Sequence, residues 1–374
     1  MKKLMDTILS LALAASMLFA LAACGAKPSA GTNPPPGSSA AAPDTTSGTS
    51  SENAQYVIRL SHANATTTFN HDNVMHWKEL VEAYTGGGVR VDIFPSGQLM
   101  GVDEELPSIL EGNIEACYIH GMIGENITDE YLLWAIPLVF GVGIDSMDNI
   151  YEFYNTDLYQ DLVANDFEQA GYKAYVAFAD CDHGIFTCKK EIDTLSDLAG
   201  LRLRSHGGGF ANDFISSVGA DPLTITSTEL STALMQGTVD GVETGKIYTD
   251  KSAFPNLNYF YECASDYAGC GNAVILSLDF YNKLPAEYQQ AVDKAGAELT
   301  EWAKDEAKVR NNESLQNLTD KGMTVTKISD EDAVAMFTAF YPTLEKAMEK
   351  NDELAQLFWY AYENYCPYDF GISK

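Results

Sequence analysis

Apolar and polar positions follow alternating strand-like and helix-like periods over the first part of the globular chain. Residues 56–63 (YVIRLSHA) form the short apolar run of a buried strand, and residues 72–88 repeat apolar side chains at helical spacing before a glycine run. The pattern continues with a strand at 89–95, a short helix at 104–113 and a strand at 114–120. This order predicts a mostly parallel sheet with helices on both faces, which is an α/β fold.

The same rhythm resumes in the second half of the chain. Helical spacing predicts helices at 210–220 and 227–237. Further strands are predicted at 172–179, 184–188, 200–205, 238–244, 259–264 and 271–277. With 374 residues, the chain is too long for one typical core and suits two lobes.

One helical pattern runs without interruption over residues 285–322. Its apolar stripe consists of Ala291, Ala295, Leu299, Trp302 and Ala303. More than 30 residues at about 1.5 Å each give roughly 50 Å, whereas a small domain is about 30 Å across. We therefore expect this helix to run along both lobes, with a ligand cleft where the carboxyl ends of the strands face each other.

The first 23 residues have the composition of a secretory signal: a basic start, an apolar run, and small residues before Cys24 (LAAC). LAAC resembles the lipobox of bacterial lipoproteins, which implies cleavage before Cys24 and a lipid on its thiol. A short transmembrane anchor is the alternative, although the run is short for a span. Residues 24–54 are rich in Ser, Gly, Pro, Ala and Thr, which predicts a flexible tether.

The net charge of the chain argues against some classes of binding partner. It has 23 Lys+Arg against 53 Asp+Glu, a formal net charge of -30. Such a charge argues against nucleic acid and against docking on anionic lipid. A lipid anchor, and not a basic patch, would therefore hold the domain at the outer face of the membrane.

Six cysteines follow Cys24. They are Cys117, Cys181, Cys188, Cys263, Cys270 and Cys366. An even number outside the cell permits disulfides, and either Cys181 with Cys188 or Cys263 with Cys270 would close a hairpin. Buried free thiols are an equal alternative. The chain has no C-x-x-C motif, which argues against a zinc ribbon or a thioredoxin-type site.

Five segments resemble DctP-type solute-binding proteins, the extracytoplasmic components of tripartite ATP-independent periplasmic (TRAP) transporters. They are VDIFPSGQL (91–99), AIPLVF (135–140), LSDLAGLRLRS (195–205), VGADPLTITSTELSTALMQGTVDGVET (218–244) and FYNKLPAEYQQAV (280–292). The order and spacing agree with that family over about residues 56–345. The resemblance implies a two-lobed type II periplasmic-binding-protein fold with a long helix spanning both lobes. It also implies capture of a small organic acid and its delivery to a membrane permease, without enzymatic activity.

On this basis we expect lobe I at 55–181 with 270–309, and lobe II at 182–269 with 310–374. We expect a monomer that is extracytoplasmic and held to the outer face of the bacterial membrane by its lipid.

The resemblance assigns the main ligand contact to Arg204, because the family strand written GLKIR carries an arginine that pairs with the ligand carboxylate. A guanidinium is planar, always charged and able to bind a carboxylate with two hydrogen bonds. Side chains alternate along a strand, so Arg202 should face the opposite side and lie at the surface. The following SHGGG loop should let the backbone approach the ligand, and the next helix should offer free N–H groups to an anion. A structural ion pair is the alternative role for Arg204.

Two more candidates depart from the family pattern. Many carboxylate-binding members have a second arginine about twenty residues before the first, where this chain has His183 instead. Many members have Asn or Trp after the glutamate that matches Glu243, where this chain has Thr244. Arg204 is then the one strong clamp, helped by His183, which favours a hydroxy, keto or sugar acid over a ligand with two distant carboxylates. Some relatives place a metal ion against that glutamate, so no cofactor is expected beyond an ion that bridges Glu243 and the ligand.

Strand ends supply the remaining candidates. His62 and Asn64 end the first strand and His120 ends the third, so all three should face the cleft. A cap of the loop is the equal alternative for His62 and Asn64.

Two other functions stay open at this stage. A secreted α/β hydrolase or lyase would use Glu243 and a histidine as acid and base. A sensory ectodomain would have the same fold without a transporter.

Overall fold

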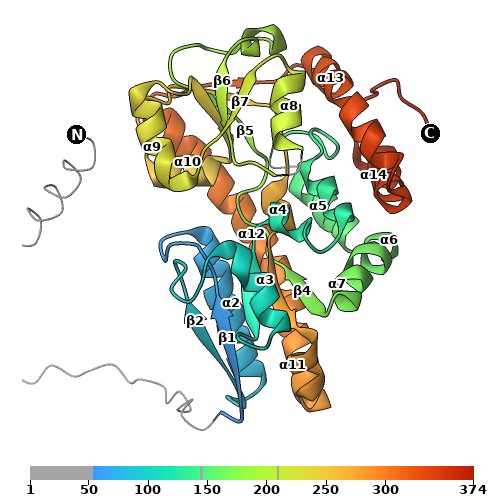
Figure 1. Cartoon of the computed structure of the whole chain (residues 1–374). Coiled ribbons are helices and arrows are strands. Elements are labelled where there is room, and N and C mark those ends of the chain that lie inside the picture. Colours follow the sequence, from blue (N-terminus) through green and yellow to red (C-terminus); the bar gives the residue numbers. More distant parts are fainter. Residues whose placement is uncertain (1–53, 144–145, 209) are drawn as a thin grey trace, which may run out of the picture. The chain divides into compact units, whose positions relative to one another are not determined.

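The computed structural model describes residues 54–143, 146–208 and 210–374 (Figure 1). The predicted signal peptide, Cys24 and the tether up to residue 53 lie outside these residues. Within the described ranges, no helix combines the length and the apolar character that crossing a bilayer requires.

The first of two sheets contains the strands β1 (Tyr56–Ser61), β2 (Val89–Phe94), β3 (Ala116–Ile119), β4 (Tyr172–Val176) and β10 (Ala273–Ser277). Their order is β2-β1-β3-β10-β4. β1 pairs in parallel with β2 and β3, whereas β10 runs antiparallel to β3 and β4.

The second sheet contains β5 (Gly184–Thr187), β6 (Arg202–Ser205), β7 (Asp221–Thr224), β8 (Gly241–Thr244), β9 (Tyr259–Glu262) and β11 (Thr324–Lys327). Their order is β11-β9-β5-β8-β6-β7, and β5 runs antiparallel to β8 and β9. Each lobe therefore has the expected α/β sheet, with one antiparallel strand among parallel ones.

The antiparallel strands arise where the chain changes lobes. β4 of the first sheet leads through residues 177–183 into β5 of the second, and β9 leads back through residues 263–272 into β10. We call these two stretches the crossing segments. They pair with each other: the amide of Ala177, for example, donates to the carbonyl oxygen of Asn272 at 2.8 Å. A strand that enters a sheet from the other lobe begins where the parallel strands of that sheet have their carboxyl ends. It therefore runs antiparallel to them.

Buried charges tie the first crossing segment to α10 and to the end of β9. Lys246, which is 3% exposed, places its Nζ 2.8 Å from Oδ2 of Asp182 and 2.9 Å from Oε1 of Glu262. Burial disfavours its charge, but these two carboxylates outweigh the burial and raise the pKa of Lys246. Gly269 permits the close approach, since a Cβ at this position would lie 2.1 Å from the carbonyl oxygen of Asp180.

Helices cover the sheets. The first group is α2 (Phe69–Tyr84), α3 (Val102–Leu110), α4 (Gly121–Gly124), η3 (Asp129–Ala135), α5 (Ser146–Tyr154), α6 (Asp157–Tyr159), η4 (Gln160–Ala164) and α7 (Asn165–Gln169). The second is η5 (Leu195–Leu198), α8 (Ala211–Ser217), α9 (Ser227–Gln236), α10 (Lys246–Ser252), η6 (Ala268–Gly271) and α11 (Leu278–Lys283). The last three are α12 (Ala286–Asp320), α13 (Asp330–Met348) and α14 (Asp352–Tyr365).

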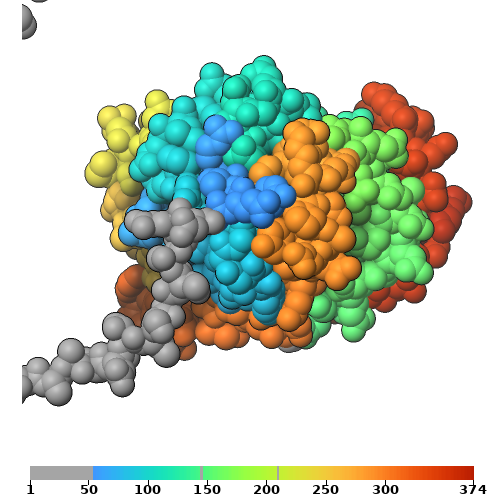
Figure 2. Space-filling model, turned by 90° about the horizontal axis from the view of Figure 1, so that it is seen from below, coloured from blue at the N-terminus to red at the C-terminus, as the bar shows by residue number. Residues whose placement is uncertain are grey.

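The long helix is present as predicted. α12 has 35 residues and contacts α2 and β4 in one lobe and α10 in the other. Seen from below, α11 and the start of α12 (orange) lie between the N-terminal elements (blue to teal) and the segment around α7 (green) (Figure 2). The buried face of α12 consists mainly of small residues, which lets this helix lie close to the first sheet.

Gly296 marks the point of closest approach between α12 and β4. A Cβ there would lie 1.9 Å from Cδ1 of Tyr175, whose hydroxyl donates to Oδ1 of Asp293 on the same helix at 2.9 Å. The helix is therefore held against the sheet by a contact that only glycine allows.

We predict that Gly296→Ala destabilises the protein by about 1–3 kcal/mol, because the added methyl group overpacks the contact with Tyr175. Intrinsic helix propensity alone predicts the opposite, a gain of about 1 kcal/mol. Denaturant unfolding of both proteins measures the difference. The control is Ala297→Gly at the exposed neighbouring position, which should lose about 1 kcal/mol through propensity alone. A Gly296→Ala protein more stable than the wild type would contradict the close approach.

Candidate functional site

A cavity of about 410 Å³ lies between the strand ends of the two sheets. From the first lobe it is lined by Asn64, Thr68, Asn70, His120 and Met122. From the second it is lined by Arg204, His206, Thr226, Ser227, Thr244 and Tyr248. The crossing segments contribute Asp180, His183, Ala268, Gly269 and Asn272. Its size is that of a site for a small ligand.

The topology explains why these residues meet. β1 and β3 are parallel, so the residues that follow them lie at one edge of the first sheet. β6 and β8 are parallel, and β5 is antiparallel to β8, so the end of β6, the end of β8 and the start of β5 share one edge of the second sheet. Five of the predicted site residues therefore line one cavity: Arg204, Thr244, His183, Asn64 and His120.

Arg204 is buried at the cavity wall, with 5% of its surface exposed. Its Nε donates to the carbonyl oxygen of Ile225 at 2.9 Å. Among the described residues no carboxylate lies within ion-pair distance of its guanidinium. Burial lowers the pKa of Arg204, and the negative charge of Glu243 acts in the opposite direction. The structure thus offers a buried cation whose own protein partner is a carbonyl oxygen.

Arg202 lies on the other face of the same strand, as expected. Its Nε and Nη2 donate to the two carboxylate oxygens of Asp240 at 3.0 and 2.8 Å, and its side chain is 44% exposed. A second hollow, of about 470 Å³, opens at this surface beside Lys189 and Lys190. Because Arg202 already has a carboxylate partner, this hollow is a weaker candidate for an acid than the cavity at Arg204.

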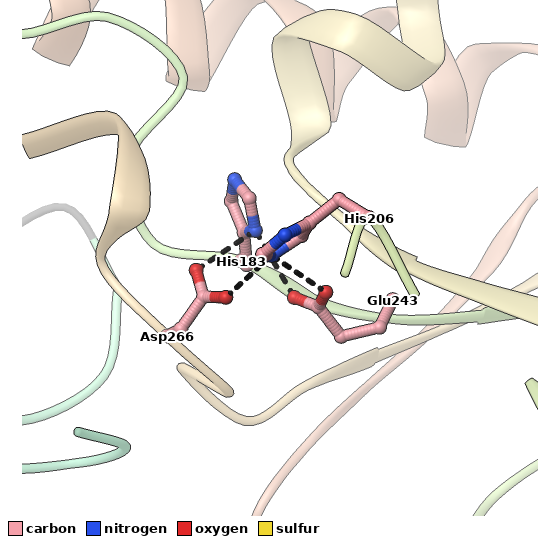
Figure 3. Close-up of side chains that lie close together, drawn as sticks. All are labelled: His183, His206, Glu243 and Asp266. Carbon is pink, nitrogen blue, oxygen red and sulfur yellow. Dashed lines mark hydrogen bonds and ion pairs between the residues drawn. The ribbon is translucent and has the colours of Figure 1, made fainter. Parts of the chain in front are cut away.

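Glu243 belongs to a buried cluster beneath the cavity wall (Figure 3). We call His183, His206, Glu243 and Asp266 the His–carboxylate cluster. Nδ1 of His183 lies 3.0 Å from Oε1 of Glu243 and 2.9 Å from Oδ1 of Asp266. Nε2 of His206 lies 3.0 Å from Oδ2 of Asp266 and 3.5 Å from Oε2 of Glu243.

The charges of the cluster dominate its ionisation. Burial alone would keep His183 neutral, but Asp266 and Glu243 outweigh it and raise the pKa of His183 well above its ordinary value. For His206 the hydrogen bond to Asp266 likewise overcomes burial and raises the pKa. The two histidines in turn lower the pKa of the buried Asp266 carboxyl.

Asn64 forms the opposite wall. Its Nδ2 is buried and has no hydrogen-bond partner among the described residues. Its Oδ1 accepts from Nδ2 of Asn70 at 3.3 Å, and Oδ1 of Asn70 accepts from Nδ2 of Asn272 at 3.2 Å. Asn64 is therefore held at the cavity wall by an ordered network of amides.

His62 lies behind this wall and does not line the cavity. Its Nδ1 accepts from the amide of Asn64 at 3.1 Å, and its Nε2 lies 3.1 Å from Nδ1 of His71. Burial, together with His71 and His120, lowers the pKa of His62 to about 4. Burial and the charge of His206 also lower the pKa of His120 to about 4. His62 thus supports the position of Asn64, and both His62 and His120 are neutral at physiological pH.

The cysteines take no part in the cavity lining. All six that the structure describes are free. Neither pairing suggested by spacing is formed. Burial, together with the neighbouring thiol of Cys181 on the other crossing segment, raises the pKa of Cys270 well above its ordinary value.

Several lining residues were not among those predicted from the sequence. His206 was considered only as part of the SHGGG loop, whose backbone was expected to approach the ligand, although it directly follows the strand that carries Arg204. The start of α9 reaches the cavity through its N-cap Thr226 and through Ser227, whereas none of the lining residues belongs to α8. Asp266 and Asn272 lie on a crossing segment without a local motif, so their proximity to the site depends on the return of the chain to the first lobe.

Comparison with known proteins agrees with this architecture. Residues 60–351 match the family model described as bacterial extracellular solute-binding protein, family 7 (DctP). The C4-dicarboxylate-binding periplasmic protein DctP of Rhodobacter capsulatus is 26% identical over 301 residues, which are 79% of this chain and 87% of the relative.

Solved structures share the fold. A TRAP periplasmic solute-binding protein from Ochrobactrum anthropi has a TM-score of 0.74 at 19% identity, over 83% of this chain and 96% of the other. One from Anaerococcus prevotii with bound D-glucuronate has a TM-score of 0.71 at 18% identity, over 82% of this chain and 97% of the other. With most of its length matched by the family model and its two lobes matched by these structures, the chain belongs to family 7 of the bacterial extracellular solute-binding proteins.

Proposed function

We propose that the protein captures a small organic acid between its two lobes and delivers it to a TRAP-type membrane permease. The observation that carries this proposal is Arg204, a buried guanidinium at the wall of a 410 Å³ cavity with no carboxylate partner among the described residues. A buried cation without a counter-charge is costly, and a ligand carboxylate would supply that counter-charge with two hydrogen bonds.

The rest of the lining supports an acid that also carries hydroxyl or keto groups. Asn64 contributes a side-chain amide to the lining, and Thr226, Ser227 and Thr244 contribute hydroxyls. Among the described residues that line the cavity, Arg204 is the only arginine or lysine, which favours a ligand with one clamped carboxylate. The Anaerococcus relative was solved with glucuronate, an acid of this type, and the Rhodobacter relative is named for C4-dicarboxylates.

We further propose that the lobes close on the ligand as two bodies, with the boundaries expected from the sequence: 55–181 with 270–309, and 182–269 with 310–374. The crossing segments and α12 are the connections between them. Closure around a ligand is the usual motion of two-lobed binding proteins. The protein acts as a monomeric receptor and not as an enzyme, so the acid leaves it unchanged.

A thermal-shift screen with a library of organic acids is expected to raise the unfolding temperature for hydroxy, keto or sugar acids, because these ligands bind only the folded state. Ligand recovered after binding should be chemically unchanged. A screen in which no carboxylate shifts the transition, or in which the acid is converted, would contradict the proposal.

We predict that Arg204→Ala weakens binding of the acid found in that screen by tens- to thousands-fold, equivalent to roughly 2–5 kcal/mol. Arg204→Lys should lose at least about tenfold, since lysine keeps the charge but not the two-pronged geometry. Arg202→Ala, on the opposite face of the strand, is the control and should change affinity by less than about tenfold. Calorimetric titration measures all three; equal losses for Arg202→Ala and Arg204→Ala would place the site elsewhere.

We also propose that a lipid on Cys24 holds the protein at the outer face of the cell membrane. The tether that follows Cys24 has no apolar side chain larger than alanine or proline with which to bind a bilayer. Cys24→Ala should therefore appear in the soluble extracytoplasmic fraction, whereas the wild type remains with the membrane. Membrane retention of Cys24→Ala would overturn the lipid anchor without affecting the proposed ligand.

A further inference from the structure

The His–carboxylate cluster combines two imidazoles and two carboxylates from four separate parts of the chain. His183 precedes β5, His206 follows β6, Glu243 is within β8, and Asp266 lies on the second crossing segment. Figure 3 shows the four side chains pointing toward one another. Each offers one nitrogen or oxygen donor, and these donors all lie within 4.8 Å of one another.

The donors lie close enough together for one small metal ion to be considered. Zn²⁺ binds imidazole nitrogen and carboxylate oxygen at about 2.0–2.2 Å in tetrahedral geometry, which places neighbouring donors roughly 3.3–3.5 Å apart. In the cluster, nitrogen–oxygen separations are 2.9 and 3.0 Å around His183 and 3.0 and 3.5 Å around His206. Each histidine faces a different oxygen of each carboxylate, and one donor atom from each of the four residues lies within 4.8 Å of the other three. The four side chains would therefore have to draw together to hold a tetrahedral ion.

An unpartnered atom points to something more than a hydrogen-bond network. Oε2 of Glu243, in a residue only 1% exposed, accepts no hydrogen bond from the described residues; its contact with Nε2 of His206, at 3.5 Å, is an ion-pair distance only. A buried carboxylate oxygen left without a partner is costly. His183 uses one atom, Nδ1, to meet both carboxylates, so a single N–H is shared between two acceptors. A central cation would give every donor a direct partner.

Charge balance also suits a divalent ion. Two neutral imidazoles, two carboxylates and one divalent cation sum to zero, so the ion needs no further counter-charge in this buried place. Ca²⁺ prefers six to eight oxygen ligands, whereas imidazole suits Zn²⁺ and similar transition metals.

Hydrogen bonds from neighbouring groups orient three of the four side chains of the cluster, as is usual for metal ligands. Nδ1 of His206 lies 2.7 Å from the carbonyl oxygen of Gly207, which places an N–H on Nδ1 and leaves the Nε2 lone pair, directed at the two carboxylates, available to a metal ion. The hydroxyl of Ser265 donates to Oε1 of Glu243 at 2.8 Å, and the amide of Ala268 donates to Oδ1 of Asp266 at 3.1 Å.

We propose that His183, His206, Glu243 and Asp266 form a binding site for a tetrahedral transition-metal ion of the Zn²⁺ type. Because His183 and His206 also line the cavity, the ion lies at the wall next to Arg204. A hydroxyl or keto oxygen of the bound acid can approach it there. The contact between the ion and the acid rests on the proposed function, whereas binding of the ion itself does not.

The test uses the mature protein, purified without a polyhistidine tag, stripped with a chelator and free of organic acid. Calorimetric titration with Zn²⁺ is expected to show one ion per chain and a raised unfolding temperature, with no comparable effect of Ca²⁺. Substitution by Co²⁺ should give the visible absorption of a tetrahedral centre. A wild-type protein that binds no Zn²⁺, or binds it with no defined stoichiometry, overturns the site and would mean that protons alone hold the cluster together.

Two variants identify the ligands. His206→Gln and Asp266→Asn keep the approximate size and hydrogen-bonding capacity of the side chains. Each should weaken Zn²⁺ binding by at least about 100-fold, because loss of a residue that only supports a metal ligand already weakens binding by up to about 100-fold. The control is His76→Gln on α2, where the imidazole stacks on Trp302 at 4.1 Å between ring centroids and should not affect Zn²⁺. Wild-type Zn²⁺ affinity in folded His206→Gln or Asp266→Asn would overturn the assignment.

Titration of the same samples with the organic acid separates the two proposals. Acid binding without Zn²⁺ binding would refute the metal site alone, and Zn²⁺ binding without any acid binding would refute the proposed function alone.

Discussion

The pairing of the two crossing segments is the constraint on which the site depends. Because the chain passes from one lobe to the other at residues 177–183 and returns at 263–272, β5 and β10 enter their sheets against the direction of their neighbours. Residues before β5 and residues after β6 and β8 therefore reach the same edge. The segments bond to each other through their backbones and enclose buried charges, so the floor of the cavity is built from the connection between the lobes.

Elements with a strong period could be predicted from the sequence, and those defined by tertiary contacts could not. The 35 residues of α12 and the alternation of Arg202 and Arg204 on β6 follow from local spacing alone. β7 and β11 were missed because each has four residues whose side chains are half-buried or exposed, without a clear apolar run. α2 begins at Phe69 and not at residue 72, because Thr68 caps it by accepting from the amide of His71.

The site shows the same division. Arg204, Thr244, His183, Asn64 and His120 lie at strand ends, where an open α/β sheet binds its ligands, so topology and resemblance together placed them. His206 and Asp266 belong to the His–carboxylate cluster only through contacts with residues 23 to 83 positions away in the sequence, so no local sequence pattern could predict their role. The reading of His62 as a lining residue missed that a strand end can turn inward, where its imidazole orders the backbone of Asn64.

The hydrogen-bond partners of the buried acidic residues determine whether the cavity presents a positive or a negative charge to a ligand. Glu243 is close enough to influence the pKa of Arg204, yet its Oε1 is bonded to His183 and Ser265 and not to the guanidinium. Asp266 is likewise held by the two histidines, and Asp180 accepts from the amides of Ile247 and Tyr248 at the start of α10. Each carboxylate near the site thus has its own partner, so none of them neutralises Arg204. A chain with a net charge of -30 can in this way present a local positive centre to an anion, because the partners of its buried acids are fixed before the ligand arrives.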